Sequence, residues 1–208
     1  MKITPFESRE QWLFARQGKI TGTRLQSIVV KRGTGEKKGF YELIAERLAV
    51  SENDFEGFIP NETPMERGTR LQKHALARLE TALGQKINDE LVLWTREDNE
   101  SIAISPDGTI GETIAVETKC LSSASHIEAY LTGKVPDEYE FQKLQYFIVN
   151  EKLQELYFCF YDPRIPCKDF FYFVIKREEV QEDVDLYLKY QLDKLARVDE
   201  IVAKLTGF

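Results

Sequence analysis

The chain lacks several features that would assign it to other classes of protein. In its 208 residues no apolar run approaches the roughly 20 residues that cross a bilayer, so we expect no membrane partner. The opening residues, MKITPFESREQW, contain no apolar core of a secretory signal. Its three cysteines are an odd number without paired spacing, which argues against a disulfide framework. Together these absences predict a cytoplasmic protein with reduced thiols.

The length and composition fit one ordinary globular domain. Hydrophobic residues make up 42% of the chain and charged residues 30%, which is typical of soluble proteins. A chain of this length can bury one sizeable core and is short for two independent ones. We therefore predict a single domain over residues 1–208.

Charge is distributed unevenly along the chain. The net charge of −7 argues against a protein that coats nucleic acid. Residues 16–38, however, hold seven basic residues against one acidic residue, whereas residues 177–208 hold eight acidic against five basic. This asymmetry allows a polyanion to bind on one face, and it fits a solvated basic loop beside an acidic helix equally well.

Periodicity and turn residues predict alternating helices and strands. A short helix follows Ser8 and ends at Gly18, and Thr21 is a second candidate helix cap. Further helices are predicted over 39–50, 65–84, 138–150 and 177–205, and a surface loop over 51–64. Strands are predicted over 90–94, 101–105, 113–119, 155–162 and 170–177, with 106–112 turning a hairpin between the second and third. The expected fold is α/β, a mixed sheet flanked by helices.

The segment SPDGTIGETIAVETKC places charged residues in an otherwise apolar strand. Side chains alternate along a strand, so Glu117 and Lys119 share one face, and the hairpin brings Asp107 near Glu117. Two carboxylates that converge in a dry interior repel each other unless a cation joins them. Oxygen ligands without a Cys–His set favour magnesium or manganese. An ammonium beside them can orient a water molecule or stabilise charge on a phosphate. The same residues also fit a plain Glu–Lys pair at the wet edge of a hairpin with an Asp-Gly turn.

Several ordered blocks resemble one nuclease family. Pro106-Asp107, nine residues and then Glu117-Thr118-Lys119 match the PD-(D/E)xK signature. Around it, WLFARQGKITGTRLQSIV, RGTRLQKHALARLE and YEFQKLQYFIV resemble blocks of the lambda-exonuclease, or YqaJ-like viral recombinase, family of phage 5′→3′ exonucleases. The resemblance implies a restriction-endonuclease-like PD-(D/E)xK core.

The resemblance also implies roles for individual residues. Asp107 and Glu117 would ligate Mg²⁺, for which Mn²⁺ can substitute, with the Thr118 carbonyl as an accessory ligand. Lys119 would serve the attacking water, and Gln142 would lie near the active site.

Arg16 and Thr23 match the family's pocket for a 5′-terminal phosphate. A guanidinium fork suits such a dianion, although a surface arginine and a helix cap are the plain alternatives. Gln145, one turn after Gln142, is best interpreted as an exposed helix residue.

One position departs from the family. Gln72 stands where the family usually carries a metal-binding glutamate, and its amide oxygen would be a weaker ligand than a carboxylate. The sequence therefore leaves open whether the site binds one metal ion or two. Glu66 and His74 do not share the side-chain direction of Gln72. For His126, the sequence does not show an approach to DNA.

By resemblance, the expected activity is degradation of duplex DNA from 5′-phosphorylated ends, which leaves 3′ single strands for phage-type recombination. Family members form ring-shaped trimers and act beside a single-strand annealing protein. The alternatives are a structure-specific endonuclease of the same superfamily and a catalytically weakened DNA-end-binding protein.

Overall fold

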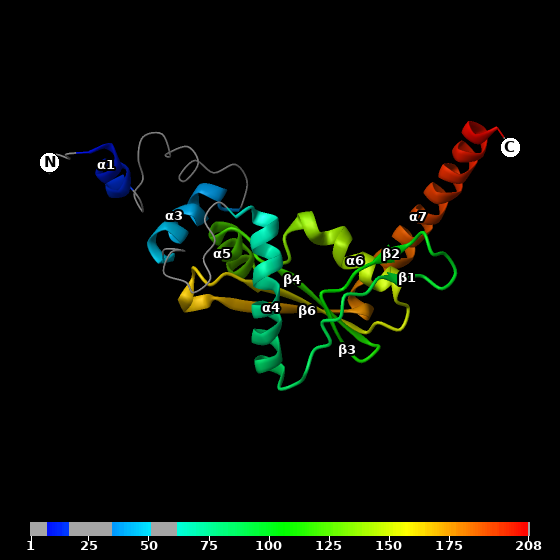
Figure 1. Cartoon of the computed structure of the whole chain (residues 1–208), viewed down its shortest axis with the longest axis horizontal. Coiled ribbons are helices and arrows are strands. Elements are labelled where there is room, and N and C mark those ends of the chain that lie inside the picture. Colours follow the sequence, from blue (N-terminus) through cyan, green and yellow to red (C-terminus); the bar gives the residue numbers. More distant parts are fainter. Residues whose placement is uncertain (1–7, 17–34, 51–61, 208) are drawn as a thin grey trace. The chain divides into compact units, whose positions relative to one another are not determined.

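The computed structural model describes residues 8–16, 35–50 and 62–207, and of α1 it leaves the side chains of Trp12, Leu13 and Arg16 undescribed (Figure 1). The chain divides into two compact units. The first comprises Met1–Thr69, Cys120–Lys134 and Phe160–Phe171, and the second comprises Arg70–Lys119, Val135–Cys159 and Tyr172–Phe208. That these units act as one domain stays a prediction.

Three α-helices lie wholly within the described residues of the first unit. They are α1 (Arg9–Arg16), α3 (Lys38–Leu48) and α5 (Ser123–Thr132). The Ser8 hydroxyl accepts a hydrogen bond from the backbone N–H of Gln11 at 3.1 Å, which confirms Ser8 as a helix cap. The predicted stop at Gly18, the cap at Thr21 and most of the loop 51–64 lie outside the described residues.

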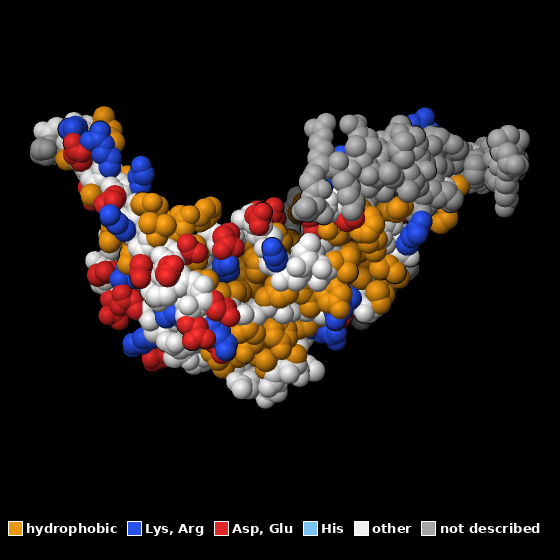
Figure 2. Space-filling model, turned by 180° about the vertical axis from the view of Figure 1, so that it is seen from behind, with side chains coloured by type: hydrophobic (Ala, Val, Ile, Leu, Met, Phe, Trp, Pro, Cys, Tyr) orange, Lys and Arg blue, Asp and Glu red, His pale blue; other side chains and the backbone are white. Residues whose placement is uncertain are grey.

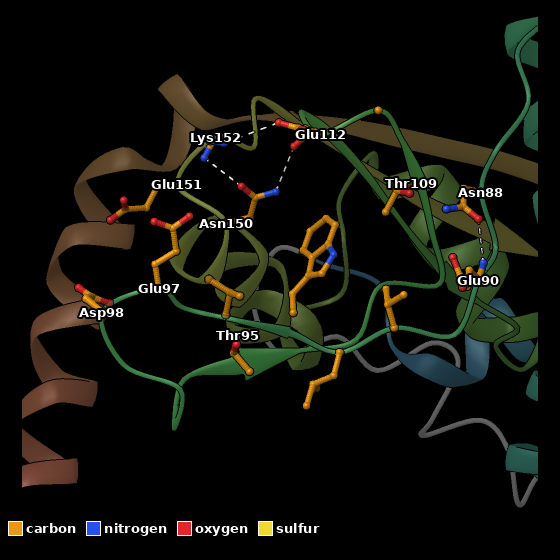
Figure 3. Close-up of a pocket in the computed structure, with 15 residues that line it drawn as sticks. Asn88, Glu90, Thr95, Glu97, Asp98, Thr109, Glu112, Asn150, Glu151 and Lys152 are labelled. Carbon is orange, nitrogen blue, oxygen red and sulfur yellow. Dashed lines mark hydrogen bonds and ion pairs between the residues drawn. The ribbon is translucent and has the colours of Figure 1, made fainter.

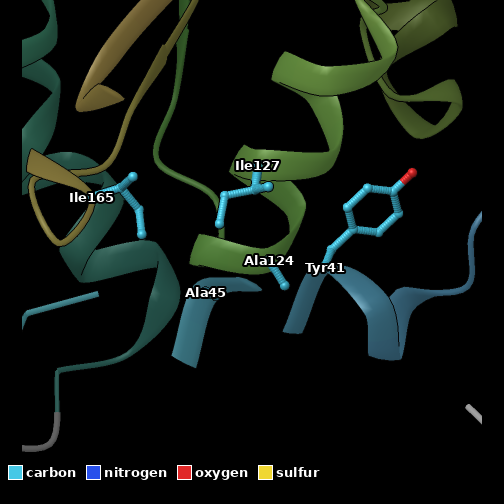
Figure 4. Packing of buried hydrophobic residues seen from close by; sticks show 5 residues of the cluster. All are labelled: Tyr41, Ala45, Ala124, Ile127 and Ile165. Carbon is cyan, nitrogen blue, oxygen red and sulfur yellow. The ribbon is translucent and has the colours of Figure 1, made fainter. Parts of the chain in front are cut away.

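Helices α3 and α5 pack together through small and aliphatic side chains. Tyr41 and Ala45 of α3 meet Ala124 and Ile127 of α5, with Ile165 completing the cluster (Figure 4). The two alanines allow the helix backbones to approach closely, so a small set of side chains closes this core.

A buried carboxylate organises the loops of the first unit. Asp162 accepts hydrogen bonds from the Ser123 hydroxyl at 2.6 Å and from the Arg164 guanidinium at 2.7 Å. Arg164 and Arg67 each donate to the carbonyl of Leu121 at 2.9 Å. The charge of Asp162 is thus satisfied, as a buried carboxylate requires.

Helix α4 (Pro64–Leu83) and a four-stranded sheet follow. The sheet has the order β3 (Gly108–Ile110), β4 (Ile114–Lys119), β5 (Glu155–Tyr161), β6 (Phe170–Lys176). A separate antiparallel pair joins β1 (Trp94–Thr95) and β2 (Ala103–Ile104). The 3-10 turns η2 (Asp137–Tyr139) and η3 (Pro166–Lys168), with helices α6 (Glu140–Val149) and α7 (Arg177–Thr206), complete the described elements. The predicted α/β class is confirmed.

The hairpin prediction is partly wrong. Strand β4 does not pair with β2 but with β3, which lies inside the segment assigned to the turn. The reversal comes at Gly111, whose φ of +61° is a left-handed conformation that glycine adopts readily. Gly108 is buried, and a Cβ there would lie 2.5 Å from the Ile87 Cγ2 atom. This close approach explains why a Pro-Asp-Gly sequence begins a strand here.

Other boundaries differ from the sequence prediction as well. Helix α5 falls in a segment for which the sequence predicted no helix, and the Ser122 side chain caps it and Gly133 ends it at φ +66°. Strands β1 and β2 are shorter than predicted, two residues each. In contrast, α4 ends before Gly84 as predicted, and that residue has φ +66°.

Helix α6 packs against α7 within the second unit. The rings of Phe141 and Tyr187 meet edge to face, with centroids 5.1 Å apart. Hydrophobic side chains remain on the surface of the described chain (Figure 2), and in the last turns of α7 these are Val198, Ile201, Val202 and Leu205. Among the described helices, none combines the length and the apolar character needed to cross a membrane.

Candidate active site

The pairing of β3 with β4 brings the two predicted metal carboxylates together. Its register sets Gly108 opposite Val116, so the preceding residue, Asp107, lies opposite Glu117. The Asp107 N–H donates to the Val116 carbonyl at 3.1 Å, which continues the ladder by one bond. Asp107 therefore lies at the end of β3 remote from the turn, not near the turn as the sequence suggested.

The carboxylate of Asp107 is held by three hydrogen bonds. Thr118 donates both its backbone N–H and its hydroxyl to Oδ2, each at 2.7 Å. The Gln72 amide nitrogen, on α4, donates to Oδ1 at 2.9 Å. Gln72 is thus in direct contact with Asp107, as its position in the helix block suggested.

Glu117 is buried, with 4% of its surface exposed, and three groups donate to it. The Lys119 ammonium lies 2.7 Å from Oε1, and the Gln142 amide nitrogen donates to the same oxygen at 2.8 Å. The Tyr146 hydroxyl donates to Oε2. The charge of Glu117 is therefore compensated inside the protein.

Burial raises the pKa of Glu117 above its usual value, and the charge of Asp107 raises it further. Lys119 and Tyr146 oppose this shift, because an ammonium and a hydroxyl donor both favour the carboxylate form. Burial raises the pKa of the Tyr146 phenol, and the charge of Glu117 raises it further. Burial, with a smaller effect from Glu138, raises the pKa of Tyr139 to about 12. Both phenols are thus proton donors at neutral pH.

Lys119 is fixed by more than its ion pair. Its ammonium donates to the Gln142 amide oxygen at 2.9 Å and lies 4.6 Å from the centre of the Tyr139 ring. Its side chain is 18% exposed, so solvent still reaches it. Gln142 joins Lys119 and Glu117 by accepting from one and donating to the other.

Helix α6 supplies two of the groups around Glu117. Gln142 and Tyr146 are four residues apart and therefore lie on one face of the helix. The sequence indicated Gln142 but not Tyr146, for which the helical spacing was the available signal. Gln145 was predicted to be an exposed helix residue, but it is partly buried, because it exchanges hydrogen bonds with Gln191 of α7 at 2.8 Å and 3.2 Å.

Other candidate residues lie away from this cluster or outside the described part. Thr23 and the side chain of Arg16 are not among the described residues, so the phosphate pocket stays a prediction. Glu66 accepts from the Thr63 hydroxyl at 2.7 Å and its N–H donates to that hydroxyl at 3.3 Å, which caps α4. His74 is exposed on α4, whereas His126 is 1% exposed, and its Nε2 lies 2.8 Å from the Lys168 carbonyl.

The donor set around Asp107 and Glu117 fits a hard divalent cation. Carboxylate, amide and backbone oxygens are the ligands that magnesium and manganese prefer. A bound cation would also relieve the repulsion by which Asp107 raises the pKa of Glu117. Within residues 8–16, 35–50 and 62–207, no three His, Cys, Asp or Glu side chains gather as a metal site. A third ligand there would come from an amide or a carbonyl.

A separate pocket of about 690 Å³ lies in the second unit (Figure 3). Trp94 lines it, and its rim carries five carboxylates and one ammonium: Glu90, Glu97, Asp98, Glu112, Glu151 and Lys152. Asp98 and Glu151 both pair with the buried Arg96. None of the predicted catalytic residues lines this pocket, and its acidic rim is unsuited to DNA phosphates.

Comparisons with known proteins converge on one group. Residues 11–152 match the model of the YqaJ-like viral recombinase domain. The structure is similar to that of LHK-Exo in complex with dAMP, with 27% identity, 95% of this chain and 98% of the other covered, and a TM-score of 0.60. It is also similar to a second structure of LHK-Exo, which is described as an alkaline exonuclease from Laribacter hongkongensis, with 29% identity, 94% and 99% coverage, and a TM-score of 0.54. No curated protein matches the chain.

Proposed function

This chain belongs to the YqaJ-like viral recombinase domain family, and on that premise we propose that it is a metal-dependent deoxyribonuclease. It digests duplex DNA from 5′-phosphorylated ends and leaves a 3′ single strand. The observation that carries the proposal is the meeting of Asp107 and the buried Glu117 across β3 and β4, with the Lys119 ammonium 2.7 Å from Glu117. LHK-Exo, whose structure is similar, is named an alkaline exonuclease, which supports the same activity.

Asp107 and Glu117 hold Mg²⁺ or Mn²⁺ in this proposal, with the Thr118 carbonyl and the Gln72 amide oxygen as weaker ligands. The bound cation supplies Lewis-acid stabilisation of the charge on the phosphate and activates water. Lys119 places a positive charge beside Glu117, where it stabilises negative charge that develops on the scissile phosphate. Gln142 holds the ammonium of Lys119 and one oxygen of Glu117 in a fixed relation.

Substrate choice rests on residues near the N-terminus. Arg16 and Thr23 bind the 5′-terminal phosphate, because a guanidinium fork and a hydroxyl suit a dianion. The basic residues between 16 and 38 attract the duplex end. We further propose that the protein acts in the cytoplasm as a ring-shaped homotrimer, beside a single-strand annealing protein.

The test compares linear duplexes with and without a 5′-phosphate and closed circular DNA, each in Mg²⁺, in Mn²⁺ and in EDTA. We expect metal-dependent loss of the phosphorylated duplex from its 5′ ends, with circles intact. Nicked circles would instead indicate a structure-specific endonuclease. Binding of ends without cleavage in any metal would indicate an end-binding protein and would refute the nuclease.

A further inference from the structure

The pocket of the second unit is a cavity that the proposed nuclease chemistry does not use (Figure 3). Its volume of about 690 Å³ is within the range of ligand pockets, about 300–1,000 Å³. Three parts of the chain form its walls: residues between 88 and 98, the β3–β4 hairpin near Gly111, and residues 149–152 at the end of α6. The ligand of this pocket therefore has to be inferred from its own walls.

Hydrogen bonds hold these walls together without a ligand. The Asn150 amide nitrogen donates to the Glu112 carbonyl at 3.1 Å, and the Lys152 N–H donates to the Asn150 side-chain oxygen at 2.9 Å (Figure 3). The buried Arg96 joins the remaining wall to α6, because its guanidinium donates to the Ile148 carbonyl at 2.6 Å. The pocket is thus formed before a ligand binds, which lowers the entropic cost of binding.

The wall that contains β1 is apolar and only partly covered. The sequence predicted a strand over 90–94, but of these residues only Trp94 belongs to β1. Leu91 and Leu93 are 94% and 67% exposed, and Leu93 and Trp94 line the pocket. Exposed apolar side chains that gather beside a concave surface mark a binding site. Among the described strands β1 pairs with β2 alone, so one edge of this wall has no partner strand.

The charges around the pocket indicate the chemistry of its ligand. The five carboxylates of the rim are balanced only by Lys152 and by the buried Arg96, which already pairs with two of them. Glu90 and Glu97 are exposed and form no ion pair within the described part of the chain. This excess of negative charge repels nucleic acid and attracts a cationic ligand.

The spread of the carboxylates distinguishes a metal ion from a larger ligand. Within residues 8–16, 35–50 and 62–207, no three His, Cys, Asp or Glu side chains gather as a metal site, so the rim suits several separated positive charges. A polyamine has such charges but no side chains for the apolar wall at Leu93 and Trp94. An extended peptide with aliphatic and basic residues supplies both, and a basic side chain can also lie over the Trp94 ring.

We propose that this pocket binds a basic, apolar segment of a partner protein. Its aliphatic side chains pack on Leu93 and Trp94, and its lysine or arginine side chains lie toward Glu90 and Glu97 at the rim. The apolar contact supplies most of the affinity, whereas the rim charges speed association and select a basic partner. The inference goes beyond the proposed nuclease and does not depend on it, because it involves no group that acts on DNA.

The test is fluorescence anisotropy with a labelled peptide that carries two lysines at each end of an Ile-Val-Ile core. Glu90→Gln with Glu97→Gln removes two rim charges at nearly constant side-chain volume. The matched control is Glu182→Gln with Asp183→Asn on α7, where both residues are exposed and outside the pocket. At low salt the peptide should bind about tenfold more weakly to the rim variant and equally well to the control.

Two further measurements separate the apolar and the charged parts of the site. Leu93→Ser should weaken peptide binding about tenfold and leave the thermal unfolding midpoint unchanged, because Leu93 is a surface residue. Salt of about 1 M should reduce the affinity of the wild type to that of the rim variant, since it screens the rim charges. A peptide with glutamates in place of the lysines should not bind.

The outcomes also separate this inference from the proposed function. If the wild type does not bind the basic peptide, or if the rim variant binds it as tightly as the control does, the proposal is overturned. A lower particle mass in light scattering for either pocket variant would show that copies of this chain cover the pocket, which would overturn it as well. Cleavage of duplex DNA should be unchanged in the pocket variants, and a wild type that binds the peptide but does not cleave would refute the nuclease alone.

Discussion

Replacing Lys119 by methionine tests the centre of the proposed site. Methionine is unbranched like lysine and keeps an apolar stem, whereas it removes the charge, the donors and the contact of the ammonium with the Tyr139 ring. The ammonium contacts Glu117 and Gln142 at 2.7 Å and 2.9 Å, so its loss leaves Glu117 with Gln142 and Tyr146 as donors. The fold should survive this change.

The two consequences of the change differ in size. Loss of one preorganised group that stabilises transition-state charge typically lowers kcat by about 10²–10³, or roughly 3–4 kcal/mol. Breaking a fully buried ion pair costs about 3–5 kcal/mol of stability. Here that cost should be smaller, because Lys119 is partly exposed and the pKa of Glu117 is already raised, so the carboxyl can take up a proton. Activity should therefore fall much more than stability.

The assay is single-turnover cleavage of a 5′-phosphorylated, fluorescently labelled duplex at saturating Mg²⁺, with end binding measured by anisotropy in EDTA. Lys143→Met is the matched control, since its ammonium pairs with Glu140 at 2.6 Å and its side chain is 13% exposed. We expect a rate loss of at least about 100-fold for Lys119→Met alone, with end binding retained. Turnover within tenfold of the wild type, or an equal loss in Lys143→Met, would refute the role of Lys119.

Three further changes test other parts of the structure. Gln72→Glu replaces a hydrogen-bond donor to Asp107 by a second negative charge. It should therefore lower the thermal unfolding midpoint in EDTA and tighten Mn²⁺ binding. A calorimetric Mn²⁺ titration identical to that of the wild type would exclude Gln72 from the site. Gly108→Ala places a Cβ 2.5 Å from Ile87 and should cost about 1–3 kcal/mol in urea unfolding, so undiminished stability would contradict the close packing. Burial lowers the pKa of His126 below 6.5, so as the pH falls the unfolded chain takes up the proton before the folded protein does. The free energy of unfolding should therefore decrease below pH 6.5, by at most about 1.4 kcal/mol at pH 5.5. His126→Gln should remove this part of the pH dependence between pH 7.5 and 5.5, and identical slopes would exclude His126 as its source.

Elements with strong periodicity or long apolar runs were predictable from the sequence. Helices α4, α6 and α7 and strands β5 and β6 lie within a few residues of their predicted bounds. Helix α5 was missed because its serines and alanines give little amphipathic contrast, and a cap by Ser122 decides its start. The predicted position of the hairpin turn was wrong because Pro-Asp-Gly is a strong local turn signal. The packing of Gly108 against Ile87 and Leu76 overrides this signal.

The meeting of Asp107 and Glu117 was predictable because strand alternation and a nearby reversal sufficed. The contacts of Gln72 and Gln142 followed from the family blocks and not from periodicity. Tyr146 was not predicted, because an aromatic residue on an apolar helix face normally indicates core packing and its spacing from Gln142 was a weak signal by itself. Only the tertiary placement of α6 directs its hydroxyl at Glu117. The pocket for a 5′-phosphate at Arg16 and Thr23 lies outside the described part of the chain and stays a prediction.

The internal compensation of Glu117 has a practical consequence for handling the protein. Three donors satisfy this carboxylate without any ion, and Thr118 and Gln72 do the same for Asp107. Folding and storage should therefore not require added magnesium, unlike proteins whose structure collapses under chelation. Enzyme kept in EDTA should regain full turnover within the mixing time once Mg²⁺ is supplied in excess, with no refolding lag.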